Sequence, residues 1–135
     1  MTTGAPPSAR LGRSDTWLLE VFLACYTLVW GLGFANPLVD TFGTIPVPYS
    51  LISQAMSELT LGLLATALGA LTLTVALRGS RQQRAWGCAV VCLFWLLILF
   101  AVGRPTGWAS GVLPHYGLAS ATSWFMWVRL RRRSM

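Results

Sequence analysis

The residues most able to do chemistry in this chain lie in two segments far apart in the sequence. The only histidine, His115, is followed by Tyr116, and the isolated Arg104 lies shortly before them. Glu58 borders an uncharged apolar run. Ionisable side chains within a membrane are costly, and those that occur commonly serve a function. We therefore interpret Glu58, His115, Arg104 and Tyr116 as a candidate polar site in the outer leaflet, which Gln54 or Asp40 could join.

Three interpretations fit this candidate site. In the first, Glu58 and His115 face one cavity that opens outward and binds a proton, a quinone-like head group or a small solute. In the second, Pro114 leaves backbone carbonyls without donors at an irregular helix start, and His115, Arg104 or water supplies the donors. In the third, these residues contact another subunit.

The other reactive residue types do not form a catalytic or metal pattern. Cys25, Cys88 and Cys92 lie in apolar runs without a Cys-x-x-Cys or zinc spacing, so we expect small buried hydrophobic residues. One histidine cannot supply two axial ligands to a b-type haem. The sequence contains no phosphate-binding loop and no dinucleotide-binding motif. We expect no catalytic residue, cofactor or metal, and a non-enzymatic protein is favoured over an enzyme.

The composition indicates that lipid surrounds most of the chain. Of its 135 residues, 55% are hydrophobic and 10% are charged, whereas soluble domains carry about 25% charged residues. The seven tryptophans are typical of a membrane boundary. A chain of this length forms one domain.

Four apolar stretches are long enough for transmembrane helices, which need roughly 20 residues. They predict an all-α fold, an integral membrane four-helix bundle. Residues 1–14 form an N-terminal tail, residues 15–130 form the transmembrane domain, and residues 131–135 form a basic tail. The predicted spans are 17–35, 51–77, 85–102 and 109–128.

The arginines predict the orientation of this bundle. All ten basic residues are arginine, and nine of them lie in the N-terminal segment, the loop between the second and third spans, and the C-terminal segment. With four spans these segments share one side, which the positive-inside rule assigns to the cytoplasm. We expect both termini there, in a bacterial inner membrane. A basic cluster beside a span is a membrane anchor that binds anionic lipid, and we expect no nucleic acid partner; its members are Arg129, Arg131, Arg132 and Arg133.

Small residues predict where helices approach closely. Gly62 and Thr66, and Ala65 and Gly69, are spaced as small-xxx-small pairs in the second span. Gly117 and Ala121 form such a pair in the fourth. These faces suit packing inside the bundle, and use of one face in a homo-oligomer is the alternative.

The second apolar run, "SELTLGLLATALGALTLTVA", combines Glu58 at its outer end with Gly62 and Gly69. It resembles the second helix of DoxX-type four-helix membrane proteins, and the likeness covers roughly residues 17–100. That resemblance implies a four-helix membrane fold and, as in some members, a role beside quinone-coupled oxidation. Such families often carry a basic residue after the first helix, where this chain has Asn36 and Asp40.

These observations favour a small multi-pass inner-membrane protein, a non-enzymatic accessory or small-ligand-binding subunit. Its expected partners are the lipid bilayer and either further copies or a larger membrane complex. Two alternatives stand beside it: an oligomeric transporter, channel or holin-like pore, and a membrane subunit of a quinone-linked redox complex.

Overall fold

The described part of the chain is almost entirely helical. A computed structural model describes residues 14–106 and 113–132, and within these ranges helix is the only regular secondary structure. The predicted all-α class is therefore confirmed. The helices are α2 (Ser14–Ala35), α3 (Thr41–Thr44), α4 (Pro46–Ala55), α5 (Glu58–Arg78), α6 (Arg81–Thr106) and α7 (Leu113–Arg132).

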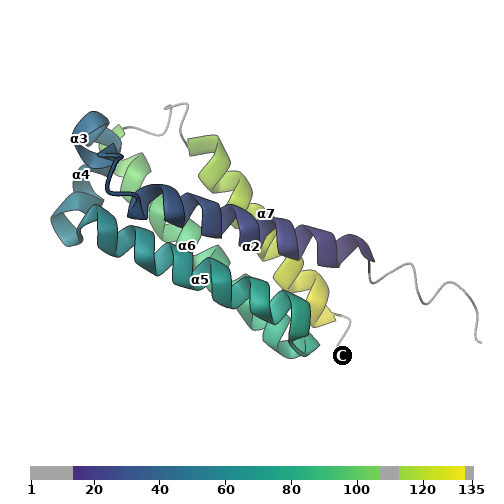
Figure 1. The fold of residues 1–135 in the computed structure, drawn as a ribbon. Helices are drawn as coiled ribbons and strands as arrows, with labels where there is room; N and C mark the ends of the chain where they lie inside the picture. Colours follow the sequence, from purple (N-terminus) through teal and green to yellow (C-terminus); the bar gives the residue numbers. More distant parts are fainter. Residues whose placement is uncertain (1–13, 107–112, 133–135) are drawn as a thin grey trace, which may run out of the picture.

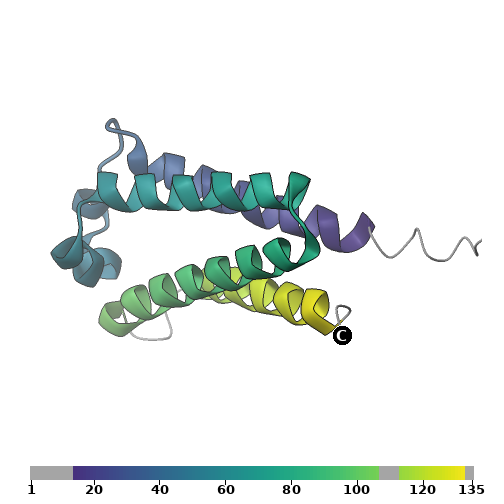
Figure 2. The ribbon, with the colours of Figure 1, turned by 90° about the horizontal axis from the view of Figure 1, so that it is seen from below.

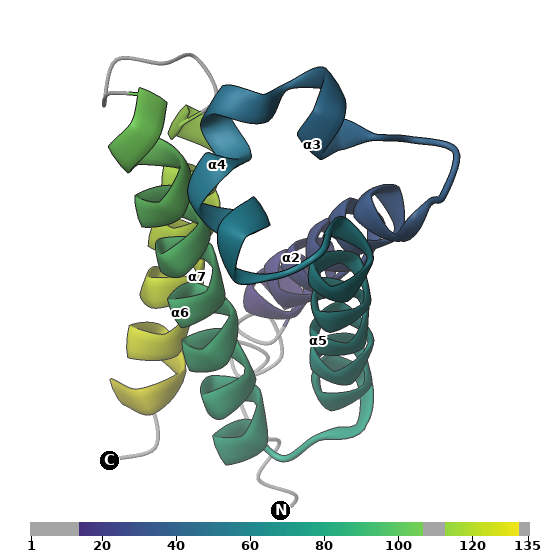
Figure 3. The same ribbon diagram turned by 90° about the vertical axis from the view of Figure 1, so that its left-hand side faces the viewer.

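The four long helices form two packed pairs. Helix α2 packs mainly on α5, and α6 packs mainly on α7. The two pairs lie as layers joined by the turn between α5 and α6 (Figure 2). At the opposite end, the short helices α3 and α4 leave the α2–α5 layer, and α4 packs on α6 (Figures 1 and 3). The connection between α2 and α5 thus helps to hold the two layers together.

The segment predicted as one span over 51–77 is divided by the structure. Helix α4 begins at Pro46 and ends at Ala55, and Met56 and Ser57 have extended backbone. The Ser57 hydroxyl accepts a hydrogen bond from the Thr60 backbone N–H, 3.2 Å away. This N-cap satisfies one donor at the start of α5 and so favours a new helix there. The proline-containing segment before it therefore forms a separate helix that lies across the end of the bundle.

The bounds of the third and fourth predicted spans also differ from the helices of the structure. Helix α6 extends beyond 85–102 at both ends and includes Pro105 in its last turn. The fourth predicted span corresponds to α7, which runs to Arg132. Residues 109–112, the first of that predicted span, lie outside the described residues.

Polar side chains are buried while large apolar side chains cover the surface. In water such a surface would be unfavourable, whereas against lipid chains it costs little. The buried polar residues are Glu20, Thr27, Thr72, Ser120 and Ser123. The exposed apolar residues include Leu18, Phe22, Leu63, Leu71, Leu97, Phe100 and Phe125.

Among the described residues, three helical segments are long and apolar enough to cross a membrane. They are Trp17–Ala35, Glu58–Arg78 and Arg81–Thr106. The chain is thus compatible with a membrane protein. Helix α7 does not reach this composition, because arginines fill its last turn and polar residues occupy its buried face.

Candidate functional site

Glu58 lies at the first position of α5 and binds the start of α3. Its two carboxylate oxygens accept hydrogen bonds from the backbone N–H groups of Thr41, at 2.9 Å, and Phe42, at 3.2 Å. The first N–H groups of a helix have no partner within it, so a carboxylate there is favourable. Asp40 adds a second cap, because its Oδ1 accepts from Gly43 N at 2.7 Å. Glu58 therefore ties the α2–α5 connection to the end of the bundle.

Tyr116 is the one buried member of the predicted site. Its hydroxyl lies 2.8 Å from the Tyr49 hydroxyl, which joins α7 to α4. Its ring stacks on Trp95, with centroids 5.6 Å apart. Burial raises the pKa of the Tyr49 hydroxyl above its ordinary value, and the nearby Glu58 carboxylate acts in the same direction. The Tyr49 hydroxyl therefore stays neutral at physiological pH, and its hydrogen bond with Tyr116 links α4 to α7.

These two tyrosines belong to an aromatic cluster that fills this half of the bundle. Trp30 is central, with its ring edge-on to both Trp95 and Tyr116. Aromatic pairs in such arrangements add attraction beyond the area they bury. The aromatic cluster consists of Tyr26, Trp30, Phe34, Phe42, Tyr49, Phe94, Trp95 and Tyr116.

His115 and Arg104 lie apart from Glu58 in the contacts of the described residues. Both side chains are exposed. The His115 ring contacts the Tyr116 ring edge-on, with centroids 5.3 Å apart. Successive helical residues point about 100° apart, so the inward direction of Tyr116 turns His115 outward. Of the four predicted site residues, the structure brings together only His115 and Tyr116. Gln54 is exposed, and residues 107–112 lie outside the described ranges.

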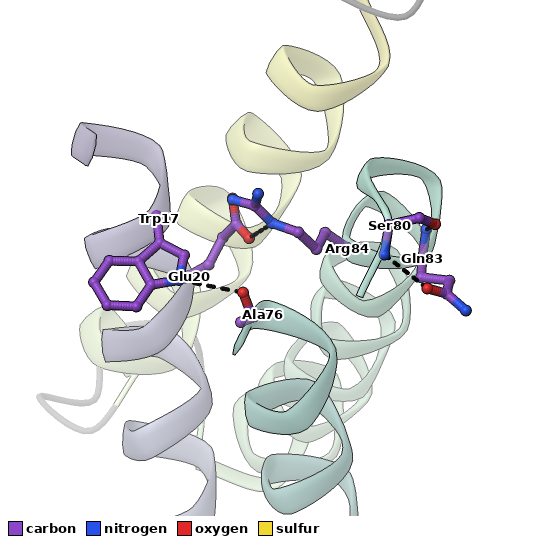
Figure 4. Close-up of polar contacts among 6 residues, drawn as sticks. All are labelled: Trp17, Glu20, Ala76, Ser80, Gln83 and Arg84. Atoms are coloured by element: carbon purple, nitrogen blue, oxygen red, sulfur yellow. Dashed lines mark hydrogen bonds and ion pairs between the residues drawn. The ribbon is translucent and has the colours of Figure 1, made fainter. Parts of the chain in front are cut away.

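A bidentate ion pair lies at the opposite end of the bundle and was not predicted. The guanidinium of Arg84, in α6, donates to both carboxylate oxygens of Glu20, in α2, at 2.6 and 2.7 Å (Figure 4). Glu20 is 2% exposed and Arg84 is 10% exposed. Two parallel charge-assisted bonds are the most favourable geometry for this pair. The pair therefore links the two layers of the bundle.

Two further contacts surround this ion pair. The Trp17 indole donates to the Ala76 carbonyl at 3.2 Å, which joins the start of α2 to the last turns of α5. Ser80 and Gln83 cap α6, since the Gln83 Oε1 accepts from Ser80 N at 2.7 Å (Figure 4). Neither Glu20 nor Arg84 is among the site residues predicted from the sequence. The sequence does contain a signal for this pair. Glu20 lies near the start of the first predicted span and Arg84 just before the third, and the predicted topology places both ends on the same side of the membrane.

Several buried polar groups in the middle of the bundle find partners within it, whereas the buried Thr66 Oγ1 has no hydrogen bond among the described residues. The Trp95 indole donates to the Thr27 hydroxyl at 3.2 Å, and that hydroxyl donates to the Leu23 carbonyl at 2.9 Å. The Cys92 thiol lies 3.6 Å from the Ser120 hydroxyl. Cys88 and Cys92 are buried free thiols and Cys25 is a half-buried one. Among the described residues, no three potential metal-binding side chains come together.

The small residues of α5 lie where α2 approaches most closely. A Cβ added at Gly62 would meet the backbone of Phe34 and Ala35, and one at Gly69 would lie 2.5 Å from Leu28 N. Ala65 is fully buried. Gly31 of α2 faces Thr66 in the same contact. In contrast, a Cβ at Gly117 would meet no described atom within 4 Å, and Ala121 is exposed.

Two of the predicted membrane-anchor arginines lie over aromatic rings. Arg129 Cζ is 5.9 Å from the Phe125 ring centroid, and Arg131 Cζ is 5.3 Å from that of Trp127. Arg132 is exposed, and Arg133 lies outside the described residues. Cation–π contacts of this kind orient a guanidinium at a boundary between apolar and polar surroundings.

No family model, no curated protein and no solved structure matches the chain. The resemblance to DoxX-type proteins stays a prediction.

Proposed function

We propose that this chain is a bacterial inner-membrane protein that crosses the bilayer four times and acts as a non-enzymatic accessory or small-ligand-binding subunit. The placement in lipid is supported by the three helices of membrane-crossing length and by polar groups that turn inward. Unpaired polar groups are costly in lipid. The internal pairs Glu20–Arg84 and Thr27–Trp95 remove that cost.

Helix α7 serves as the fourth span because it lies antiparallel along α6. Cys92 meets Ser120, and Trp95, one turn further along α6, meets Tyr116, one turn earlier in α7. A helix packed along a membrane-spanning helix shares its depth. The polar residues that lower its apolar character are turned away from lipid, since Ser120 and Ser123 are buried while Leu118 and Phe125 are exposed.

The dense packing inside the bundle supports an accessory role. Trp95, Val91, Val102 and Met126 are fully buried, and the aromatic cluster fills the half of the bundle that contains Tyr116. A single copy with such a packed core does not hold a passage for solute between its own helices. Transport would need a path between several copies, whereas an accessory subunit needs only a stable core and an outer surface.

The assembly state in native membranes tests this role. We expect the chain, extracted in mild detergent, to migrate in a larger complex with a second protein at fixed stoichiometry. The same chain expressed alone should run as a smaller species. In liposomes the purified chain should neither conduct ions nor release an enclosed dye. Dye release on reconstitution of the chain alone would support the pore alternative instead. A visible absorbance band that persists through purification would support the redox alternative.

A further inference from the structure

A pocket opens between the start of α6 and the end of α7. Its volume is about 340 Å³, and both helices contribute one arginine to it, Arg81 from α6 and Arg131 from α7. Gln82 adds an amide, and Leu130 is a buried part of the lining. The lining is completed by two indole rings, Trp86 and Trp127. The described residues that line the pocket include no carboxylate.

This lining suits a phosphate group. Guanidinium groups bind phosphate oxygens through paired N–H donors, and an amide adds a further donor. Trp86 is 64% exposed, and indoles commonly lie at the level of lipid head groups. Basic pockets between transmembrane helices on the cytoplasmic side are sites for anionic head groups.

An apolar groove begins about one helical turn from Trp86. It lies between α5 and α6, has a volume of about 390 Å³, and includes Val90, Leu93 and Leu97 of α6. Residues four apart lie on one face of a helix, so Trp86 of the pocket and Val90 of the groove lie on the same face of α6. Leu64 and Leu68 of α5 form the opposite wall. An acyl chain fits such a leucine-lined groove, whereas helix partners in membranes favour small residues.

We infer that the α6–α7 pocket binds the phosphate of an anionic phospholipid, with an acyl chain of that lipid along the α5–α6 groove. This inference depends on the proposed membrane insertion but on no assembly partner. A failure to find a partner complex would therefore leave the lipid experiment unaffected.

The experiment measures lipid binding to the full chain in detergent after removal of co-purified lipid. The probes are phosphatidylglycerol, phosphatidylcholine with the same acyl chains, and soluble glycerol 3-phosphate. We expect retention of phosphatidylglycerol in native mass spectrometry, with at least about 10-fold weaker binding of phosphatidylcholine. Glycerol 3-phosphate should bind still more weakly, because it lacks the acyl chain. Equal binding of glycerol 3-phosphate and the anionic lipid would overturn the lipid assignment.

Two matched pairs of variants locate the site. Arg81→Gln with Arg131→Gln should weaken phosphatidylglycerol binding by about 30-fold, at about fivefold for each arginine near the lipid. Arg81→Gln alone should weaken it by about fivefold, whereas Arg78→Gln removes the same charge outside the lining and should change it less than about twofold.

The second pair tests the pocket by adding a charge. Gln82→Glu places a carboxylate in the lining, at a helix start where negative charge favours folding. Gln83→Glu adds the same charge one residue away and preserves the capping pattern with Ser80. We expect Gln82→Glu alone to weaken lipid binding. Equal losses in both variants of either pair would show that only overall charge matters and would overturn the pocket.

Discussion

Glu20 and Arg84 illustrate how a buried charge is tolerated in this bundle. Removing two charges from water is costly, and their mutual attraction offsets that cost only when the geometry is favourable. Here both carboxylate oxygens are bound within 2.7 Å of a guanidinium nitrogen. The loss of one partner leaves an uncompensated charge, while the loss of both leaves none. The two kinds of variant should therefore differ sharply.

We predict that Arg84→Ala lowers the free energy of unfolding by about 3–5 kcal/mol, because Glu20 remains buried without its partner. The double variant Glu20→Leu with Arg84→Met should lie within about 1 kcal/mol of the parent chain. Arg78→Ala removes an exposed arginine near the same end of the bundle. This variant should change the free energy of unfolding by less than about 0.5 kcal/mol. Reversible unfolding in detergent micelles measures all three. If the double variant lost as much stability as Arg84→Ala alone, Glu20 and Arg84 would not act as a pair.

The residue types at this scale are visible in the sequence, but their partners are not. Glu58 and Tyr116 were predicted to be functional because they are polar groups beside apolar runs. Their actual partners, two backbone N–H groups of the α2–α5 connection and the hydroxyl of Tyr49, depend on how that connection folds over the bundle. Periodicity does not predict this, because the connection contains three prolines and two short helices.

Helices α2 and α5 approach so closely that glycine is needed at their contact. In lipid there is little hydrophobic drive to bring helices together, so close backbone packing supplies much of the attraction. Gly31 of α2 and Gly62 and Gly69 of α5 lie where an added Cβ would meet backbone atoms of the partner helix. The helical glycines Gly33 and Gly117 have nothing described within 4 Å of such a Cβ. The chain thus contains its own controls for the effect of a methyl group.

We predict that Gly62→Ala and Gly69→Ala each destabilise the bundle by about 1–3 kcal/mol, the usual cost of overpacking. Gly33→Ala and Gly117→Ala should be neutral or stabilising by up to about 1 kcal/mol, because alanine favours helix over glycine. Thermal unfolding in one detergent compares the four variants. A uniform gain in all of them would mean that α2 and α5 are not held at the distance seen here.

The sequence predicted the long helices better than their ends. Length and the absence of charge were sufficient for the three apolar spans, because these properties are local. The break between α4 and α5 was missed, since its signal is a single Ser57 cap inside an otherwise helical run. Small-residue spacing is a local signal and occurs in both α5 and α7. The backbone of α2 lies against Gly62 and Gly69, whereas no partner helix of the described residues lies within reach of Gly117.

At the scale of the whole molecule, the two ends of the bundle differ in their content of arginine. One end contains the start of α2, the turn between α5 and α6, and the end of α7 (Figure 1). Most described arginines lie there. The other end contains α3, α4 and Arg104. A bilayer that holds this bundle upright would therefore meet most of the described arginines on one side, and the positive-inside rule predicts which side that is.

Impermeant maleimide labelling of intact cells checks this orientation. Leu38→Cys lies at a 90% exposed position before α3, and Ser80→Cys lies in the turn before α6. We expect Leu38→Cys to react in intact cells and Ser80→Cys to react only after permeabilisation. The parent chain is the background control, because two of its three cysteines are buried and the third is half-buried.

A reporter fused after Met135 separates the number of crossings from their direction. If α7 spans the bilayer beside α6, the C-terminus lies on the same side as Ser80, which we expect to be the cytoplasm. A fluorescent protein fused there should then fluoresce, and alkaline phosphatase should stay inactive. The opposite result with unchanged maleimide labelling would mean three crossings, with α7 unable to span despite its contacts with α6. Reversal of both measurements would instead retain four crossings and invert the bundle, against the charge asymmetry of its ends.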